Sequence, residues 1–241
     1  MKTKNISILL ILACISLFSY SCSFLGNCVD GEGKIIEKTL QLDKFSKIEL
    51  SGSTKVYIKE GNTQSVRIKA QSNLIELLNT AIIDGEWDIQ FSECIKTKET
   101  IEIYIVIPLV EKLEIKGSGE IISDGTLSND KLELEIKGSG EMELIINAKD
   151  LISKIAGSGD LKLKGETEKH SISIKGSGDI KAYELISNET EVSIKGSGDV
   201  KINTNESLEV EIFGSGDVSY KGNAQKVNSN IKGSGDLNRI N

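Results

Sequence analysis

The chain has 241 residues, with 29 Lys and Arg against 36 Asp and Glu, one His, four Cys, one Pro and 23 Gly. This length accommodates one well-packed domain, and the ordinary hydrophobic and charged fractions exclude a disordered chain. The acidic excess argues against nucleic acid as a partner, and a single His excludes metal sites built from several histidines.

Residues 1–21 have the features of a signal peptide. Two lysines precede an apolar run over residues 6–18, which is too short to cross a bilayer comfortably. The run is followed by Ser-Tyr-Ser directly before Cys22, and small residues before a Cys resemble a bacterial lipoprotein signal. We therefore predict lipidation of Cys22, with Cys14 as the alternative site and an ordinary secretory signal as the other interpretation. Residues 22–32 then form a short tether.

Two further cysteines, Cys28 and Cys94, lie in the predicted mature chain. A compartment outside the cytosol permits a disulfide between them. The sequence does not show whether they are close in space, so a Cys28–Cys94 disulfide and two free thiols both stay open.

An internal repeat dominates the rest of the chain. The tripeptide Gly-Ser-Gly recurs at steps of 18 to 21 residues, each time two residues after an Ile and directly before an acid. The seven copies begin at Gly117, Gly138, Gly157, Gly176, Gly196, Gly214 and Gly233. The acids are Glu120, Glu141, Asp160, Asp179, Asp199, Asp217 and Asp236.

Around each Gly-Ser-Gly, apolar and polar residues alternate, which is the pattern of half-buried strands. One repeat cannot bury its apolar side alone, whereas stacked copies turn each apolar column into a continuous core. We predict an all-β fold, a right-handed parallel β-helix with coils of about 19–20 residues, in which the glycines form a corner. An antiparallel sandwich or barrel is the alternative.

The predicted solenoid domain covers residues 33–241, with irregular N-terminal coils over 33–110 and the seven repeats over 111–241. In the irregular part, Lys47–Lys59 is a degenerate copy of the repeat and Asn73–Thr80 has the character of a helical turn. A strand over Ile101–Ile107 ends at Pro108.

The order of landmarks in residues 33–238 resembles a known family, the putative auto-transporter adhesin, head GIN domain. The landmarks are Phe45-Ser-Lys-Ile-Glu-Leu-Ser-Gly, Val56-Tyr-Ile-Lys-Glu-Gly, Asn73-Leu-Ile, Ile105-Val-Ile-Pro-Leu and Gly117-Ser-Gly-Glu. Phe213 and Ala156 depart from the Lys that the repeat has at their positions. The resemblance implies a right-handed β-helix in the envelope of a Bacteroidetes-type bacterium, and it carries over no catalytic residues.

The acid column is a candidate Ca²⁺ stack, but each coil supplies one carboxylate and the spacing of calcium-binding β-rolls is absent. We predict a solvated face of alternating charge, with the Lys that stands four residues before the acid in five of the copies offsetting the repulsion. His170 falls in a mostly apolar column, which favours a capping or partly buried side chain over a catalytic base. The seven repeated serines have only one histidine to act as a base, so they are not predicted to be nucleophiles. No metal site or cofactor is predicted either.

These features predict a non-enzymatic, lipid-anchored β-helix of the cell envelope, in the outer membrane and facing either the periplasm or the surface. Its role is that of an adhesin or interaction module for extended carbohydrate or protein. The alternative is a structural protein that self-assembles into homo-oligomers, because the last repeat ends close to Asn241 without an obvious cap. A carbohydrate-active enzyme is a third hypothesis.

Overall fold

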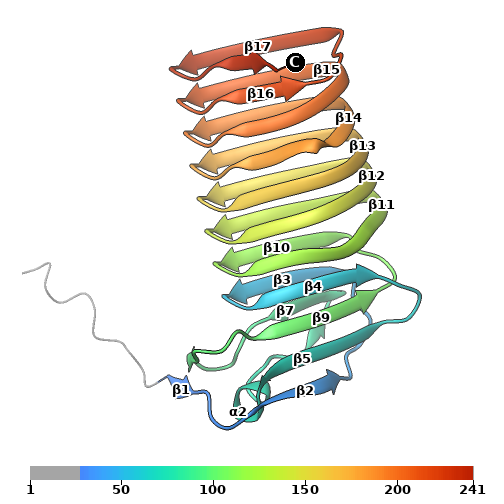
Figure 1. Cartoon of the computed structure of the whole chain (residues 1–241), viewed down its shortest axis with the longest axis vertical. Helices are drawn as coiled ribbons and strands as arrows, with labels where there is room; N and C mark the ends of the chain where they lie inside the picture. Colours follow the sequence, from blue (N-terminus) through green and yellow to red (C-terminus); the bar gives the residue numbers. More distant parts are fainter. Residues whose placement is uncertain (1–27, 241) are drawn as a thin grey trace, which may run out of the picture.

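The computed structural model describes residues 28–240, and its strands build one tall stack (Figure 1). The N-terminal part contains β1 Val29–Asp30, β2 Ile35–Leu40, β3 Lys47–Gly52, β4 Lys55–Glu60, β5 Ser65–Gln71, α2 Ser72–Ile75, β6 Ile82–Ile83, β7 Glu86–Ile89, β8 Ile95–Lys96 and β9 Glu102–Ile107. The repeats contain β10 Lys112–Gly117, β11 Glu120–Gly138, β12 Glu141–Gly157, β13 Asp160–Gly176, β14 Ile180–Gly196, β15 Val200–Gly214, β16 Val218–Lys221, β17 Lys226–Gly233 and β18 Leu237–Arg239.

Successive repeats stack in parallel and in register, as the sequence predicts. Ile174 pairs with Ile194, and Ile194 pairs with Ile212, so the isoleucine before each Gly-Ser-Gly forms one column. Each of β11 to β15 runs along one side of the stack, turns, and returns along the other side to the next glycine corner (Figure 1). The prediction of a parallel β-solenoid is confirmed.

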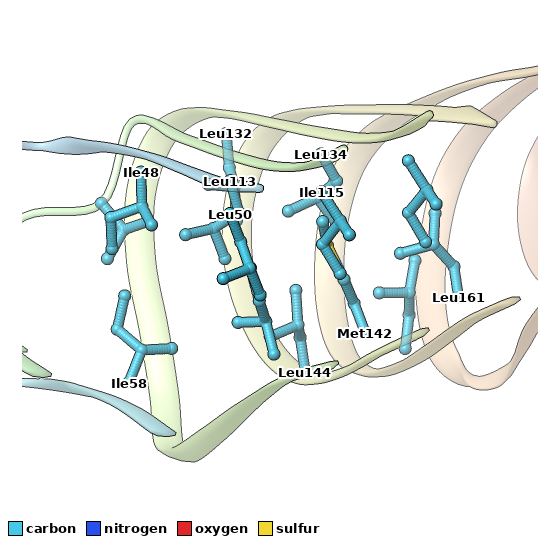
Figure 2. Close-up of a cluster of buried hydrophobic side chains, with 14 of the residues drawn as sticks. Ile48, Leu50, Ile58, Leu113, Ile115, Leu132, Leu134, Met142, Leu144 and Leu161 are labelled. Carbon is cyan, nitrogen blue, oxygen red and sulfur yellow. The ribbon is translucent and has the colours of Figure 1, made fainter. Parts of the chain in front are cut away.

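The core is the space between the two sides of the stack. Figure 2 shows side chains from successive coils filling this space, with Leu113 and Leu134 from one side and Met142 and Leu144 from the other. These side chains are completely buried because alternate residues of each strand point inward. Since the columns stay in register, each coil covers the apolar surface of the coil beneath it.

The order of coils in the N-terminal part does not follow the order of the chain. β10 lies on β3, and β3 lies in turn on β7. The chain therefore builds the β3–β4 coil, descends to place β7 and β9 beneath it, and returns above it to begin the repeats. Local sequence patterns carry no information on this order of coils, and it was not predicted from the sequence.

An antiparallel layer covers this lower end of the stack (Figure 1). β5 pairs antiparallel with β9, and β2 pairs antiparallel with β5. The helix α2 follows β5 and buries Leu74 and Ile75, which agrees with the helical turn expected there. No helix within residues 28–240 has both the length and the apolar character required to cross a bilayer.

Candidate functional site: a groove along the second corner

Each coil has two corners, and they are built differently. The first corner is the Gly-Ser-Gly segment. The second corner lies between the two halves of each long strand. Its inward-facing residues form one register column, which consists of Asn129, Ala148, Thr167, Ser187 and Thr204.

The first corner admits only glycine because adjacent coils touch there through their backbones. Gly176 has a φ of +130°, and a Cβ atom on it would lie 2.2 Å from the carbonyl oxygen of Gly157. Side chains rarely adopt this backbone conformation, and no real Cβ contact is this short. The first corner is therefore the same in every coil for a structural reason.

The acids that follow the glycines also have a structural role. The N–H of Asp199 donates to Oδ1 of Asp179 at 3.0 Å, and the N–H of Asp217 donates to Oδ1 of Asp199 at 2.9 Å. The same bond links Asp236 to Asp217 at 2.8 Å. These carboxylates thus join one coil to the next, and the three of them from Asp179 to Asp217 are half-buried.

The acid column is half-buried or exposed along its length, and these hydrogen bonds add a structural role that the sequence did not predict. Asp160, whose repeat has Ala156 in place of the Lys, takes its counter-charge from the following coil. Lys181, two residues after the acid of its own repeat, reaches Oδ2 of Asp160 in the preceding coil at 2.7 Å. Across residues 28–240, no three His, Cys, Asp or Glu side chains are grouped so that they could hold a metal ion.

Polar side chains close the second corner from inside. The Thr167 hydroxyl donates to the carbonyl of Lys149 at 3.1 Å, and the Thr204 hydroxyl donates to the carbonyl of Asn188 at 3.1 Å. Thr167 and Thr204 are buried, so these bonds hold the backbone of the corner inward, coil by coil.

Because the middle residue of the second corner points inward, the outward residues on either side of it leave a groove between them. This groove follows the second corner along the axis of the stack. One row of outward residues comes before the inward column and consists of Ser128, Asn147, Glu166 and Ile186. A second row comes after it and consists of Asp130, Lys149, Glu168 and Asn188. The two rows enclose a groove of about 600 Å³, within the size range of ligand sites.

The groove is polar and open to solvent. Lys149 Nζ lies 2.8 Å from Oδ1 of Asp130, and this hydrogen bond raises the pKa of Lys149. Glu166 and Glu168 form no ion pair with any basic residue in the part of the chain that the structure describes. One surface is therefore lined by amides, two carboxylates without an ion pair, and the half-exposed Ile186.

The groove continues toward the lower coils. Asn129 and Asp130 also line a second hollow of about 570 Å³, which reaches Lys47 and Glu86. Next to this hollow, the buried carboxylate of Glu114 forms ion pairs. Its Oε2 lies 2.6 Å from Nζ of Lys112, and its Oε1 lies 2.8 Å from Nζ of Lys137. Burial raises the pKa of Glu114, but the two lysines outweigh it and hold the pKa below its ordinary value.

His170 has a structural role. It occupies the column predicted for it, between Leu151 and Thr190, and it is more deeply buried than expected. Its Nε2 lies 2.9 Å from Oγ of Ser153 in the preceding coil. Burial lowers the pKa of His170 to about 3, so the ring is neutral at physiological pH. His170 does not line the groove.

Of the cysteines, Cys28 and Cys94 form a disulfide beside the pairing of β1 with β8. Cys22, Cys14 and the predicted signal segment over residues 1–21 lie outside the described residues.

The second corner is absent from the predictions made from the sequence. A signal was present, since small or polar residues recur at Asn129, Ala148, Thr167, Ser187 and Thr204. Their identity varies from coil to coil, however, and their meaning depends on which side of the strand faces inward.

Stacked parallel coils with a buried ladder core define this protein as a β-solenoid. The family model of the putative auto-transporter adhesin, head GIN domain, matches residues 44–224, so the chain belongs to that family. The predicted resemblance is confirmed.

Solved structures agree with this assignment. A putative adhesin from Bacteroides fragilis is 26% identical, with a TM-score of 0.83 over 88% of this chain and 100% of that chain. A putative lipid binding protein from Parabacteroides distasonis is 23% identical, with a TM-score of 0.73 over 89% and 100% of the two chains. A putative adhesin from Parabacteroides merdae is 22% identical, with a TM-score of 0.72 over 90% and 100%. No curated protein matches the chain.

Proposed function

We propose that this chain is a non-enzymatic, lipid-anchored adhesin of the bacterial cell envelope that binds an extended carbohydrate or protein in the second-corner groove. The observation that carries the proposal is the contrast between the two corners. The first is uniform for structural reasons, whereas the second presents different outward side chains on every coil. The family and its solved relatives, several of which are described as putative adhesins, support the same role.

The chemistry of the groove favours an uncharged, linear glycan. Asn147 and Asn188 supply amide donors and acceptors, and Glu166 and Glu168 supply acceptors for sugar hydroxyls. Ile186, 49% exposed, offers an apolar surface to the face of a sugar ring. Because the coils hold these groups on a rigid backbone, little conformational entropy is lost on binding.

A panel of linear hexasaccharides from cellulose, laminarin, xylan and mannan tests this assignment by calorimetry. We expect one of them to bind, and we expect Asn147→Ala combined with Glu166→Ala to weaken its binding at least about tenfold, the loss expected for two hydrogen bonds. The matched control is Lys175→Ala, an exposed change beside the first corner. Equal losses in both variants, or no binding of any glycan, would contradict the groove assignment.

The proposed anchor is tested by replacing Cys22 and the alternative Cys14 one at a time. Cys22→Ala should abolish incorporation of labelled palmitate and move the protein out of the membrane fraction, whereas Cys14→Ala should do neither. Retention of Cys22→Ala in the membrane would refute lipidation at that residue. Protease treatment of intact cells then distinguishes the surface from the periplasmic face of the outer membrane.

Self-assembly into a structural polymer is the second candidate function. The observation in its favour is the last coil, whose β17 is exposed along its whole length. Sedimentation of the mature chain over a range of concentrations separates the two functions. A chain that stays monomeric at every concentration would rule out the polymer. Turnover of acidic glycans would instead indicate an enzyme.

A further inference from the structure

β17 has one free edge. It pairs with β15 on one side, and no strand within residues 28–240 pairs with its other side. Its inward side chains Val227 and Ile231 are 38% and 37% exposed, whereas Leu208 and Ile212 in the same columns one coil earlier are at most 1% exposed. An open sheet edge with uncovered apolar side chains is a template for a further strand.

The charge of this end differs from the charge of the rest of the molecule. Residues 218–240 carry four basic residues against one acid, whereas residues 28–217 carry 23 basic residues against 35 acids. Lys226 and Lys232 border the free edge, and neither forms an ion pair with a carboxylate among the residues that the structure describes. The edge therefore attracts acidic partners.

The column that contains Lys226 indicates where the opposite charge belongs. In register order it consists of Lys131, Asp150, Lys169, Glu189, Ser207 and Lys226. Opposite charges thus face one another across neighbouring coils, and Lys169 and Glu189 form an ion pair at 3.7 Å. A strand added to β17 continues this alternation when it places an acid beside Lys226.

Two-fold pairing with a second copy is unfavourable at this edge. Two-fold pairing of β17 with β17 of another copy, centred on Ser229, places Lys226 opposite Lys232 at both ends of the pair. Like charges directly opposite each other are destabilising, and lysines on an edge strand are a known protection against edge-to-edge association.

We propose that the free edge of β17 binds an extended acidic segment of a partner protein by strand addition. The segment places apolar side chains beside Val227 and Ile231 and carboxylates beside Lys226 and Lys232. This interaction surface is separate from the second-corner groove, whose lining ends at Asn188.

Two synthetic peptides test the proposal on the mature chain by fluorescence anisotropy at low ionic strength. Their sequences are Glu-Ile-Thr-Val-Thr-Ile-Glu-Gly and Lys-Ile-Thr-Val-Thr-Ile-Lys-Gly. We expect the acidic peptide to bind about tenfold more tightly than the basic one, because two cross-strand pairs change from attraction to repulsion. Its binding should also slow hydrogen exchange at the backbone amides of β17.

Charge reversal provides the controls. Lys226→Glu combined with Lys232→Glu should invert the peptide preference. Lys201→Glu, an exposed change on β15 without an ion pair among residues 28–240, should leave it unaltered. Asn147→Ala with Glu166→Ala should also leave it unaltered, so failure of the groove assignment is distinguishable. Equal affinity for both peptides, absence of binding, or protection of β17 by dimerisation without peptide would overturn the proposal.

Discussion

The two corners of the coil solve the same geometric problem with different chemistry. At the first corner the backbones of adjacent coils come so close that a side chain is excluded, and the sequence repeats almost without change. At the second corner, inward hydroxyls and amides hold the turn, and the outward positions are free to vary. In this solenoid, repetition marks positions that build the fold, and variation marks positions available for binding.

The largest expected effect comes from placing a side chain at the first corner. Gly176→Ala should lower the free energy of unfolding by about 3–5 kcal/mol, because it adds backbone strain to a clash with the Gly157 carbonyl. Gly52→Ala is the matched control: it has a φ of +103° in the same column but no atom within 4 Å of the added Cβ. It should cost about 1–2 kcal/mol, from strain alone. Equal losses in urea unfolding would show that close approach is not the reason for glycine.

The second effect concerns His170, which begins the inward row after the second corner. Its pKa of about 3 in the folded state lies below the ordinary value of 6.5, so the unfolded chain binds the proton first. Stability is therefore fully present above pH 6.5 and declines as the pH falls toward 3. Between pH 6.5 and 4.5 the wild type should lose about 2 kcal/mol relative to His170→Leu. Parallel pH profiles of the two proteins would contradict this burial.

A smaller effect should follow from removing a hydroxyl at the second corner. Thr167→Val keeps the shape of the side chain but loses the hydroxyl that donates to the carbonyl of Lys149 or of Lys169, at a cost of about 1 kcal/mol. Thr126→Val is the control, since Thr126 is exposed and its hydroxyl has no hydrogen bond within the described part of the chain. If both variants unfold at the same urea concentration, the inward hydroxyls do not hold the corner.

The smallest effect separates the two properties of the acid column. Asp199→Asn keeps an oxygen that accepts from the Asp217 N–H while removing one of the stacked charges, so its stability should stay within about 0.5 kcal/mol of wild type. Asp199→Ala removes the acceptor and should cost about 1 kcal/mol. Thermal unfolding of both variants measures the difference. Equal losses for the Asn and Ala variants would mean that charge, and not the hydrogen bond, accounts for the acid.

Several features of this protein follow from its sequence alone. The spacing of Gly-Ser-Gly predicts coils, and the alternation around Ile174, Ile194 and Ile212 predicts which side chains face inward. Both signals are periodic and local, so a register of parallel strands follows from them without knowledge of the rest of the chain.

Other features required the tertiary structure. The placement of β7 and β9 beneath β3 depends on contacts between segments distant in the chain, and no local pattern records it. The groove depends on two outward rows that approach each other only after the inward residue between them is bonded to a neighbouring coil. Sequence periodicity determines how one coil resembles the next, but a binding surface arises where residues differ between coils, and only their stacking brings those residues together.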